Sequence, residues 1–575
     1  MDGVGLLRGR ANPRRAGKSW VLIHGLCSAV FAAIIMVASS AVYAQGVTGG
    51  QTNPGAIQQN IERQQNQFQP QTPGAVGPGV VGPKQEKAPA IQHVGPKFLL
   101  RKVTFDSSKF LSPQELKEIA AKYVGKRVDI GDLQQLIADV NALYTKKGIV
   151  TGIATLPEQN AAAGVIHIKL TEGRLEKTTL QGNDQTSSGY ILHRVGEPTG
   201  EVLDVPKLNR DVTWFNRTND AQVKALLAPG TSFGLTDLNF AVTEPARNTL
   251  EIFCDNQGIQ TTGEDECGTF YKLHSLFGVD DRLTFYGVNS VGNLNGSVAY
   301  NIPVNDWGGR LGASYTDGDI KIVQGPFQSL DETGRSKVGA INFSQPFLAT
   351  EKWLVLGNLA VNQGQTLSEF SSVPTVSDHY TKETAGGQIS YLTPEFSATI
   401  SPAGNVVSEH DNLLGINRDF DTFTNSWNVQ AQLPQNFYIS DLGSLQETGV
   451  HLLPGDQLFV IGGPTTVRGY PTNVVEGDSG YYNNVELHHN WSDVVKGFTG
   501  FDTYAFLDSG EVYSTSPARI AVMSFGAGLS WTPVPPFTFQ ASYGQPIRVV
   551  IPDQPHYEAY VRVIFRPLLL LQNPS

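Results

Sequence analysis

Two motifs in the second half of the chain carry residues suited to a buried ion pair. The first is Val467-Arg468-Gly469-Tyr470, and the second, about forty residues later, contains Phe506, Asp508 and Gly510. Side chains alternate between the two faces of a strand, so Phe506, Asp508 and Gly510 share one face. A carboxylate cannot face lipid, so in a membrane barrel Asp508 would face the lumen, where Arg468 is its candidate partner.

One stretch matches a catalytic pattern. Gly230-Thr231-Ser232-Phe233-Gly234 fits the Gly-x-Ser-x-Gly pattern of serine hydrolases, which requires a strand before it and a helix after it. Here the stretch follows Ala228-Pro229 and leads into a predicted strand at 238–242, which indicates a turn between strands. His488 and His489 are neighbours on a predicted strand and face opposite sides. We therefore expect no enzyme activity, no metal site and no cofactor.

Cysteine use points to an oxidising compartment. Cys254 and Cys267 are thirteen residues apart, and the third cysteine, Cys27, lies in the predicted signal segment. The spacing favours a disulfide, which would contribute about 3 kcal/mol through its short closed loop. Metal binding by this pair is the weaker alternative, because no His lies near enough in sequence to complete a zinc site.

The N-terminus predicts secretion. Five basic residues precede an apolar run at 21–37, and Ala44 precedes Gln45, which is typical of a cleaved signal peptide over residues 1–44. A membrane anchor is the alternative. Removing this segment takes away five basic residues and one acidic residue, so the net charge falls from −11 to −15. Such a charge argues against nucleic acid as a partner.

The next part of the chain contains a linker and two small modules. Residues 45–97 are rich in Gln, Pro and Gly, and a polar helix at 54–66 competes there with a solvated, disordered segment. Residues 98–173 follow a β-α-α-β-β pattern, with helix starts at Ser112 and Asp132. Residues 174–245 form a second, less regular copy.

Residues 246–566 alternate between polar and apolar positions. At about 20 residues per strand and loop, this length predicts roughly sixteen strands. Only a closed barrel pairs every strand edge within a membrane. We therefore predict a mainly β fold: a sixteen-stranded antiparallel transmembrane barrel that follows two α+β modules, with a tail at 567–575.

In this order, the segments resemble the two-partner secretion transporters of the outer membrane, the haemolysin secretion/activation or TpsB family. The Val-Arg-Gly-Tyr motif is the most specific signal. Asp255-Asn256-Gln257-Gly258 with Thr262-Gly263 looks like the family's first barrel hairpin. Residues 476–487 look like the strand after its conserved loop.

The resemblance implies an outer-membrane pore of a Gram-negative bacterium that recognises and translocates a large haemolysin- or adhesin-type exoprotein bearing an N-terminal two-partner secretion domain. The modules would be periplasmic POTRA domains, and helix 54–66 would plug the pore. Outer-membrane lipid and the barrel-assembly machinery would be further partners. Arg468 would meet Asp508 when its loop folds into the barrel, and the motif residues Val467 to Tyr470, Phe506, Asp508 and Gly510 would be critical for transport. A purely structural role for the pair is the alternative.

Three other functions compete with export. They are a general barrel-assembly insertase, a diffusion porin and a secreted serine hydrolase. Two modules and a plug helix favour export, since general insertases usually carry more modules. Two features depart from the family pattern: the tail after Phe565, where an aromatic residue usually ends the chain, and the cysteine pair near the first hairpin.

Overall fold

The computed structural model describes residues 49–68, 79–81, 91, 93, 95–161, 163–492, 499–515, 517–552 and 554–571. The predicted signal at 1–44 lies outside the described residues. So do most of the linker and the last four residues of the tail. None of the described helices is long and apolar enough to cross a membrane.

Residues Pro54–Asn66 form helix α2. Of the two alternatives for this segment, a polar helix and a disordered segment, the helix is confirmed. Asn53 caps its first turn, because the side-chain oxygen accepts hydrogen bonds from the N–H groups of Gly55 and Ala56. Pro54 suits the first helical position, where no N–H is needed. A short 3-10 turn, η1 (Gly49–Gln51), precedes the helix.

The first module contains strands β2 (Phe98–Leu99), β3 (Lys102–Phe105), β4 (Arg127–Val128), β5 (Gly152–Thr155) and β6 (Val165–Glu172) and helices α3 (Pro113–Ala121) and α4 (Ile130–Lys146). Both helices begin with a capping box, Ser112 with Glu115 and Asp129 with Asp132. The predicted start of the second helix at Asp132 is therefore wrong by one turn, because Asp129 is the cap and Asp132 is its partner in the box. The Lys147 ammonium and the Ser112 N–H lower the pKa of Glu115 to about 2. Leu133, Leu136 and Val140 of α4 pack into the core, as their helical spacing predicts.

The second module contains β7 (Arg174–Gln181), α5 (Ser188–Val195), α6 (Val205–Thr218), β8 (Gln222–Pro229) and β9 (Leu235–Thr243). The helical spacing at Leu208–Phe215 predicts α6, whereas α5 is only eight residues long and shows no such pattern. Its sheet has the order β1-β8-β9-β7, where β1 (Val80–Val81) comes from the linker and pairs with β8 in parallel. Residues 230–234 join β8 to β9, so the Gly-x-Ser-x-Gly stretch has no helix after it.

Sixteen antiparallel strands close into a barrel, as predicted. They are β10 (Asn248–Asp255), β11 (Glu266–His274), β12 (Arg282–Asn289), β13 (Asn293–Pro303), β14 (Arg310–Lys321), β15 (Glu332–Ala349), β16 (Trp353–Phe370), β17 (Val373–Leu392), β18 (Phe396–Asp411), β19 (Ile416–Gln432), β20 (Phe437–Glu447), β23 (Ser479–Asn490), β24 (Phe501–Tyr513), β25 (Arg519–Val534), β26 (Phe537–Pro546) and β27 (Glu558–Phe565). Strand β27 ends at Phe565, and η4 (Pro567–Leu570) follows.

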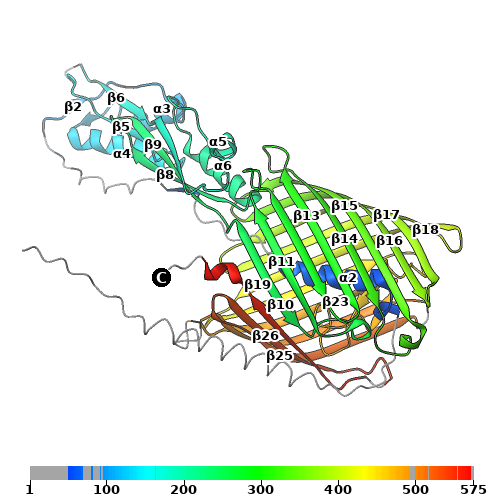
Figure 1. Ribbon diagram of the computed structural model, residues 1–575. Helices are drawn as coiled ribbons and strands as arrows, with labels where there is room; N and C mark the ends of the chain where they lie inside the picture. Colours follow the sequence, from blue (N-terminus) through cyan, green and yellow to red (C-terminus); the bar gives the residue numbers. More distant parts are fainter. Residues whose placement is uncertain are drawn as a thin grey trace, which may run out of the picture. The chain divides into compact units, whose positions relative to one another are not determined.

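Burial alternates along the barrel wall. On β24, Phe506 and Asp508 are buried while Leu507 is 44% exposed, which gives the polar lumen and apolar outer face of a membrane barrel. Helix α2 lies inside the strands, against β14, β15 and β16 (Figure 1). The barrel interior is therefore occupied by a segment that comes from before the modules in the chain.

Candidate functional site

The segment between β20 and β23 folds into the barrel. Within this inner loop (residues 448–478), β21 (Phe459–Ile461) pairs with β22 (Val475–Gly477) as a small hairpin. Gly462, Gly463 and Gly469 have φ angles of 113°, 90° and 84°, which side chains other than glycine rarely tolerate. These glycines turn the backbone so that the Val-Arg-Gly-Tyr motif meets the wall.

Arg468 and Asp508 form a bidentate ion pair. Arg468 Nε donates to Asp508 Oδ2 at 2.7 Å, and its Nη2 donates to Oδ1 at 2.7 Å. The Arg468 backbone N–H donates to the same carboxylate at 3.0 Å. The Phe506 ring packs against the guanidinium, with its centroid 3.6 Å from Cζ. The planar fork of arginine suits this geometry, which a lysine could not reproduce.

The other motif residues make room for this pair or anchor it. Val467 and Tyr470 are fully buried, and the Tyr470 hydroxyl lies 3.0 Å from both Met523 O and Arg548 O. At Gly510, an added Cβ would lie 2.9 Å from Ile461 and 3.1 Å from Val467. Gly510 therefore leaves the space that the loop needs to approach β24.

Three further wall residues, which no sequence motif singled out for this site, extend the pair. Glu486 on β23 forms a second ion pair with Arg468. His488 then bridges Glu486 and Asp502, with 2.7 Å from its ring nitrogens to each carboxylate. Alternation places Glu486 and His488 on one face of β23, and this signal could have found them.

The inner loop also holds helix α2. Asn473 Nδ2 donates to Gly50 O at 3.1 Å and to Ala56 O at 3.0 Å. Gln59 Nε2 donates to Asp456 O at 2.9 Å, and Arg63 donates to Asn473 Oδ1 at 3.3 Å. The helix and the loop are thus bonded through several side-chain contacts.

A second buried ion pair crosses the closing strands of the barrel. Strand β10 pairs with β27 over four residues, whereas the other neighbouring strands pair over eight or more. At this seam Arg562 Nε lies 2.6 Å from Asp255 Oδ2, and Arg562 Nη1 donates to Gln67 Oε1 at 2.6 Å. Alternation along the strand gives the face on which Arg562 lies, but no local pattern identifies Asp255 as its partner.

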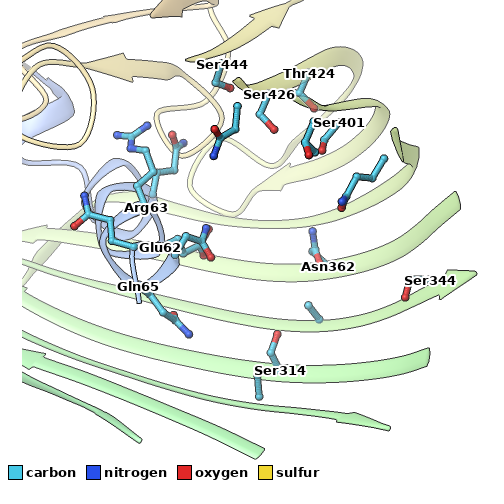
Figure 2. A pocket seen from close by; sticks show the side chains of 18 of the residues that line it. Glu62, Arg63, Gln65, Ser314, Ser344, Asn362, Ser401, Thr424, Ser426 and Ser444 are labelled. Atoms are coloured by element: carbon cyan, nitrogen blue, oxygen red, sulfur yellow. The ribbon is translucent and has the colours of Figure 1, made fainter. Parts of the chain in front are cut away.

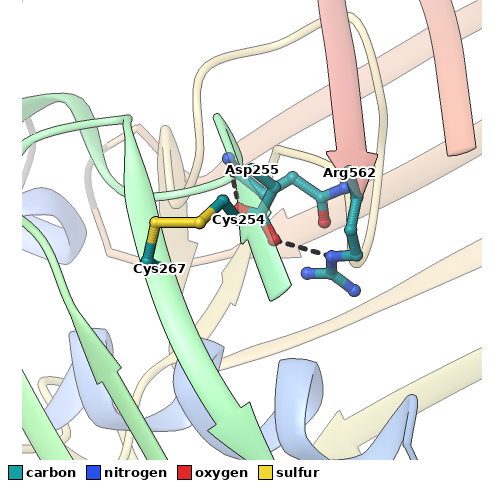
Figure 3. Close-up of a disulfide and its surroundings, with 5 residues drawn as sticks. Cys254, Asp255, Cys267 and Arg562 are labelled. Atoms are coloured by element: carbon teal, nitrogen blue, oxygen red, sulfur yellow. Dashed lines mark hydrogen bonds and ion pairs between the residues drawn. A yellow bond between two sulfur atoms is a disulfide. The ribbon is translucent and has the colours of Figure 1, made fainter. Parts of the chain in front are cut away.

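Cys254 and Cys267 form a disulfide between β10 and β11. Figure 3 shows it beside the Asp255–Arg562 pair. Cys254 neighbours Asp255, so the disulfide lies on the face of the strand opposite the buried carboxylate. It links the first two barrel strands next to the seam.

The remaining lumen is a polar cavity of about 1440 Å³. Figure 2 shows Glu62, Arg63 and Gln65 of α2 on one side and small polar side chains of the wall around the cavity. Hydroxyl and amide groups dominate the labelled wall residues: Ser314, Ser344, Asn362, Ser401, Thr424, Ser426 and Ser444. These labelled wall residues offer hydrogen bonds and are themselves uncharged.

A closed barrel with an occupied lumen and an N-terminal α+β module defines an outer-membrane transporter class. The family model of the ShlB-type POTRA domain matches residues 98–173. The family model of the haemolysin secretion/activation protein ShlB/FhaC/HecB matches residues 234–531. The chain belongs to this haemolysin secretion/activation family, the outer-membrane transporters of two-partner secretion. Its POTRA region is periplasmic, and family membership favours export over the insertase, porin and hydrolase alternatives.

Two relatives illustrate the similarity. Outer membrane transporter CdiB of Dickeya dadantii (strain 3937) is 27% identical over 445 residues, which cover 73% of this chain and 77% of the relative. Heme/hemopexin transporter protein HuxB of Haemophilus influenzae (strain 86-028NP) is 21% identical, over 78% of this chain and 83% of the relative.

The fold matches a solved structure. CdiB from Escherichia coli superposes with a TM-score of 0.66 at 20% identity, and the match covers 90% of this chain and 99% of the other. At this identity the similarity supports the barrel architecture and not the roles of individual residues.

Proposed function

We propose that this transporter exports one large partner protein that carries an N-terminal two-partner secretion domain, and that the partner crosses the barrel in an extended form. The occupied lumen carries this proposal. Helix α2 fills part of a polar channel and is held by side-chain hydrogen bonds, which an incoming chain can replace. We propose that α2 is the resting plug.

We propose a division of labour along the chain. Residues 1–44 act as the signal, 45–97 as plug helix and linker, 98–173 and 174–245 as two POTRA domains, 246–566 as the barrel and 567–575 as the tail. Outer-membrane lipid surrounds the barrel, and the barrel-assembly machinery inserts it. No nucleic acid takes part, and the protein acts without catalysis, metal or cofactor.

We propose that Val467, Arg468, Gly469, Tyr470, Phe506, Asp508 and Gly510 are critical for transport. The bidentate pair fixes the inner loop against β24, and the same loop holds α2 through Asn473. Loop position and plug position are therefore linked through a few residues. A purely structural pair would leave export unchanged once stability is restored.

We propose that the partner docks on the second module at the edge of β8. In the resting structure the linker residues Val80 and Val81 pair with Ala225 and Leu226 at this edge. An extended segment of the partner could replace these two residues and gain the same main-chain hydrogen bonds. The linker that leads to α2 would be released in the same step.

The test is export of the neighbouring exoprotein in cells that carry or lack this transporter. The partner should reach the cell surface with the intact chain and remain in the periplasm without it. In planar bilayers, removing residues 49–68 should raise the conductance of the pore severalfold. An unchanged conductance would refute α2 as the plug.

A further inference from the structure

Arg217, in the last turn of α6, is a buried cation whose side chain has no hydrogen bond to the described residues. The residue is 6% exposed, and it lines the lumen cavity. None of its three guanidinium nitrogens has a hydrogen-bond partner in the described part of the chain. Burial lowers the pKa of Arg217. A cation removed from water without an acceptor raises the free energy of the folded state.

The other basic residues of the cavity wall have partners. The described lining contains five basic residues and three acidic ones, although the whole chain has a net charge of −11. Arg282 pairs with Asp220 at 2.9 Å, and Arg310 pairs with Asp280 at 3.2 Å. Arg63 bonds to Asn473, and Lys382 interacts electrostatically with Glu62 and Asp456. Among these described lining cations, Arg217 is thus the one with none of its donors in use.

The backbone around Arg217 is held on both sides. The Asn216 amide group donates to Val223 O at 2.8 Å and accepts from Val223 N at 2.7 Å. Asn219 Nδ2 donates to Phe215 O at 3.0 Å. These bonds tie the end of α6 to the start of β8 and so fix the backbone from which the Arg217 side chain extends.

We infer that Arg217 is a docking site for a carboxylate side chain of the exported polypeptide where the second module borders the lumen. A carboxylate matches the planar guanidinium bidentately and recovers the free energy of the unsatisfied donors. This site rests on the proposed export function. It specifies that the cavity wall recognises an acidic side chain of the exported polypeptide.

A helix dipole gives the competing structural explanation, because a cation is favoured in the last turn of a helix. If Arg217 only stabilised α6, then Arg217→Met would lower the melting temperature of the protein. If Arg217 serves a ligand, Arg217→Met removes an unpaired buried charge, and the melting temperature stays equal or rises. A clear fall in melting temperature with unchanged peptide binding would overturn the inference.

Binding is measured with the full-length protein in detergent by fluorescence anisotropy of labelled deca-glutamate. Arg217→Gln should weaken binding about tenfold, as expected for the loss of a charge-assisted hydrogen bond. Arg210→Gln is the matched control, because Arg210 is exposed on the same helix, and it should bind within about twofold of wild type. Deca-lysine should not bind.

Equal affinity of wild type and Arg217→Gln for deca-glutamate, or equal binding of deca-lysine, would overturn the inference. Measuring export of the natural partner distinguishes a failure of the docking site from a failure of the proposed export function. If peptide binding is insensitive to Arg217 while wild type still exports, the docking site is wrong and the export function stands. If wild type fails to export, the proposed function falls instead.

Discussion

The backbone of Gly469 in the inner loop lies against the backbone of Gly544 on β26. A Cβ added to Gly469 would be 2.9 Å from Gly544 C, and one added to Gly544 would be 2.6 Å from Gly469 N. Neither neighbour is a flexible side chain that could move away. The motif glycine thus has a matching glycine on the wall, and together they set how closely the loop approaches.

Gly544→Ala should displace the inner loop, since a methyl group in this contact costs about 1–3 kcal/mol. We expect faster trypsin cleavage at Arg468 in the purified protein and reduced export of the partner. Gly339→Ala on β15 is the control, because no atom lies within 4 Å of its added Cβ. Equal cleavage of both variants would contradict this packing argument.

Arg468→Ala should reduce export strongly, because it leaves the buried Asp508 carboxylate without its partner. Breaking a buried pair costs about 3–5 kcal/mol of stability. Arg468→Lys keeps the charge but loses the fork, so we expect an intermediate export level. The double variant Arg468→Met with Asp508→Leu tests the structural alternative. Restored heat resistance together with restored export would show that the pair serves stability alone.

Asn473→Gly should loosen the plug. Asn473 has a φ of 56°, which glycine adopts easily, so the change removes the side chain while sparing the backbone. Loss of the bonds to Gly50 O and Ala56 O should make open-channel events about tenfold more frequent in planar bilayers. Val450→Ala, at an exposed position near the start of the same loop, should leave the event frequency unchanged. If Asn473→Gly opens no more often than wild type, the bonds of Asn473 do not hold the plug in place.

Replacing both Cys254 and Cys267 by Ser should lower the thermal stability of the barrel by about 3 kcal/mol. Reductant should produce the same loss in the wild-type protein and none in the double variant. Heat-modifiability on gels and the melting temperature measure the effect. Wild-type protein that melts identically with and without reductant would argue against a stabilising bond.

Arg562→Gln should weaken the seam between β10 and β27. Both side chains of the pair with Asp255 are buried, and β10 and β27 pair over four residues. We expect amide hydrogen exchange in residues 558–565 to rise about tenfold or more. Arg519→Gln removes an exposed arginine from its pair with Glu511 on other strands and should leave the seam protected. Unchanged exchange at the seam would mean that backbone pairing suffices there.

Local patterns predicted much of the fold. Alternation along the chain predicted the sixteen strands, because the period of two is a property of each strand by itself. Helical spacing predicted α4, the Ser112-Pro113 pair predicted the start of α3, and Pro54 marked the start of α2. The eight-residue helix α5 was not predicted, since so short a helix shows barely two turns of periodicity.

The sequence by itself determined the strand periodicity, the modules and, through motif resemblance, the residues Arg468 and Asp508. Only the tertiary structure decided that Glu486 joins them, that Gly544 faces Gly469 and that Arg562 meets Asp255 across 307 positions of sequence. The physical reason is that periodicity fixes which face a side chain takes, while barrel closure and the path of the inner loop decide which distant side chains share that face. No local pattern carries that information.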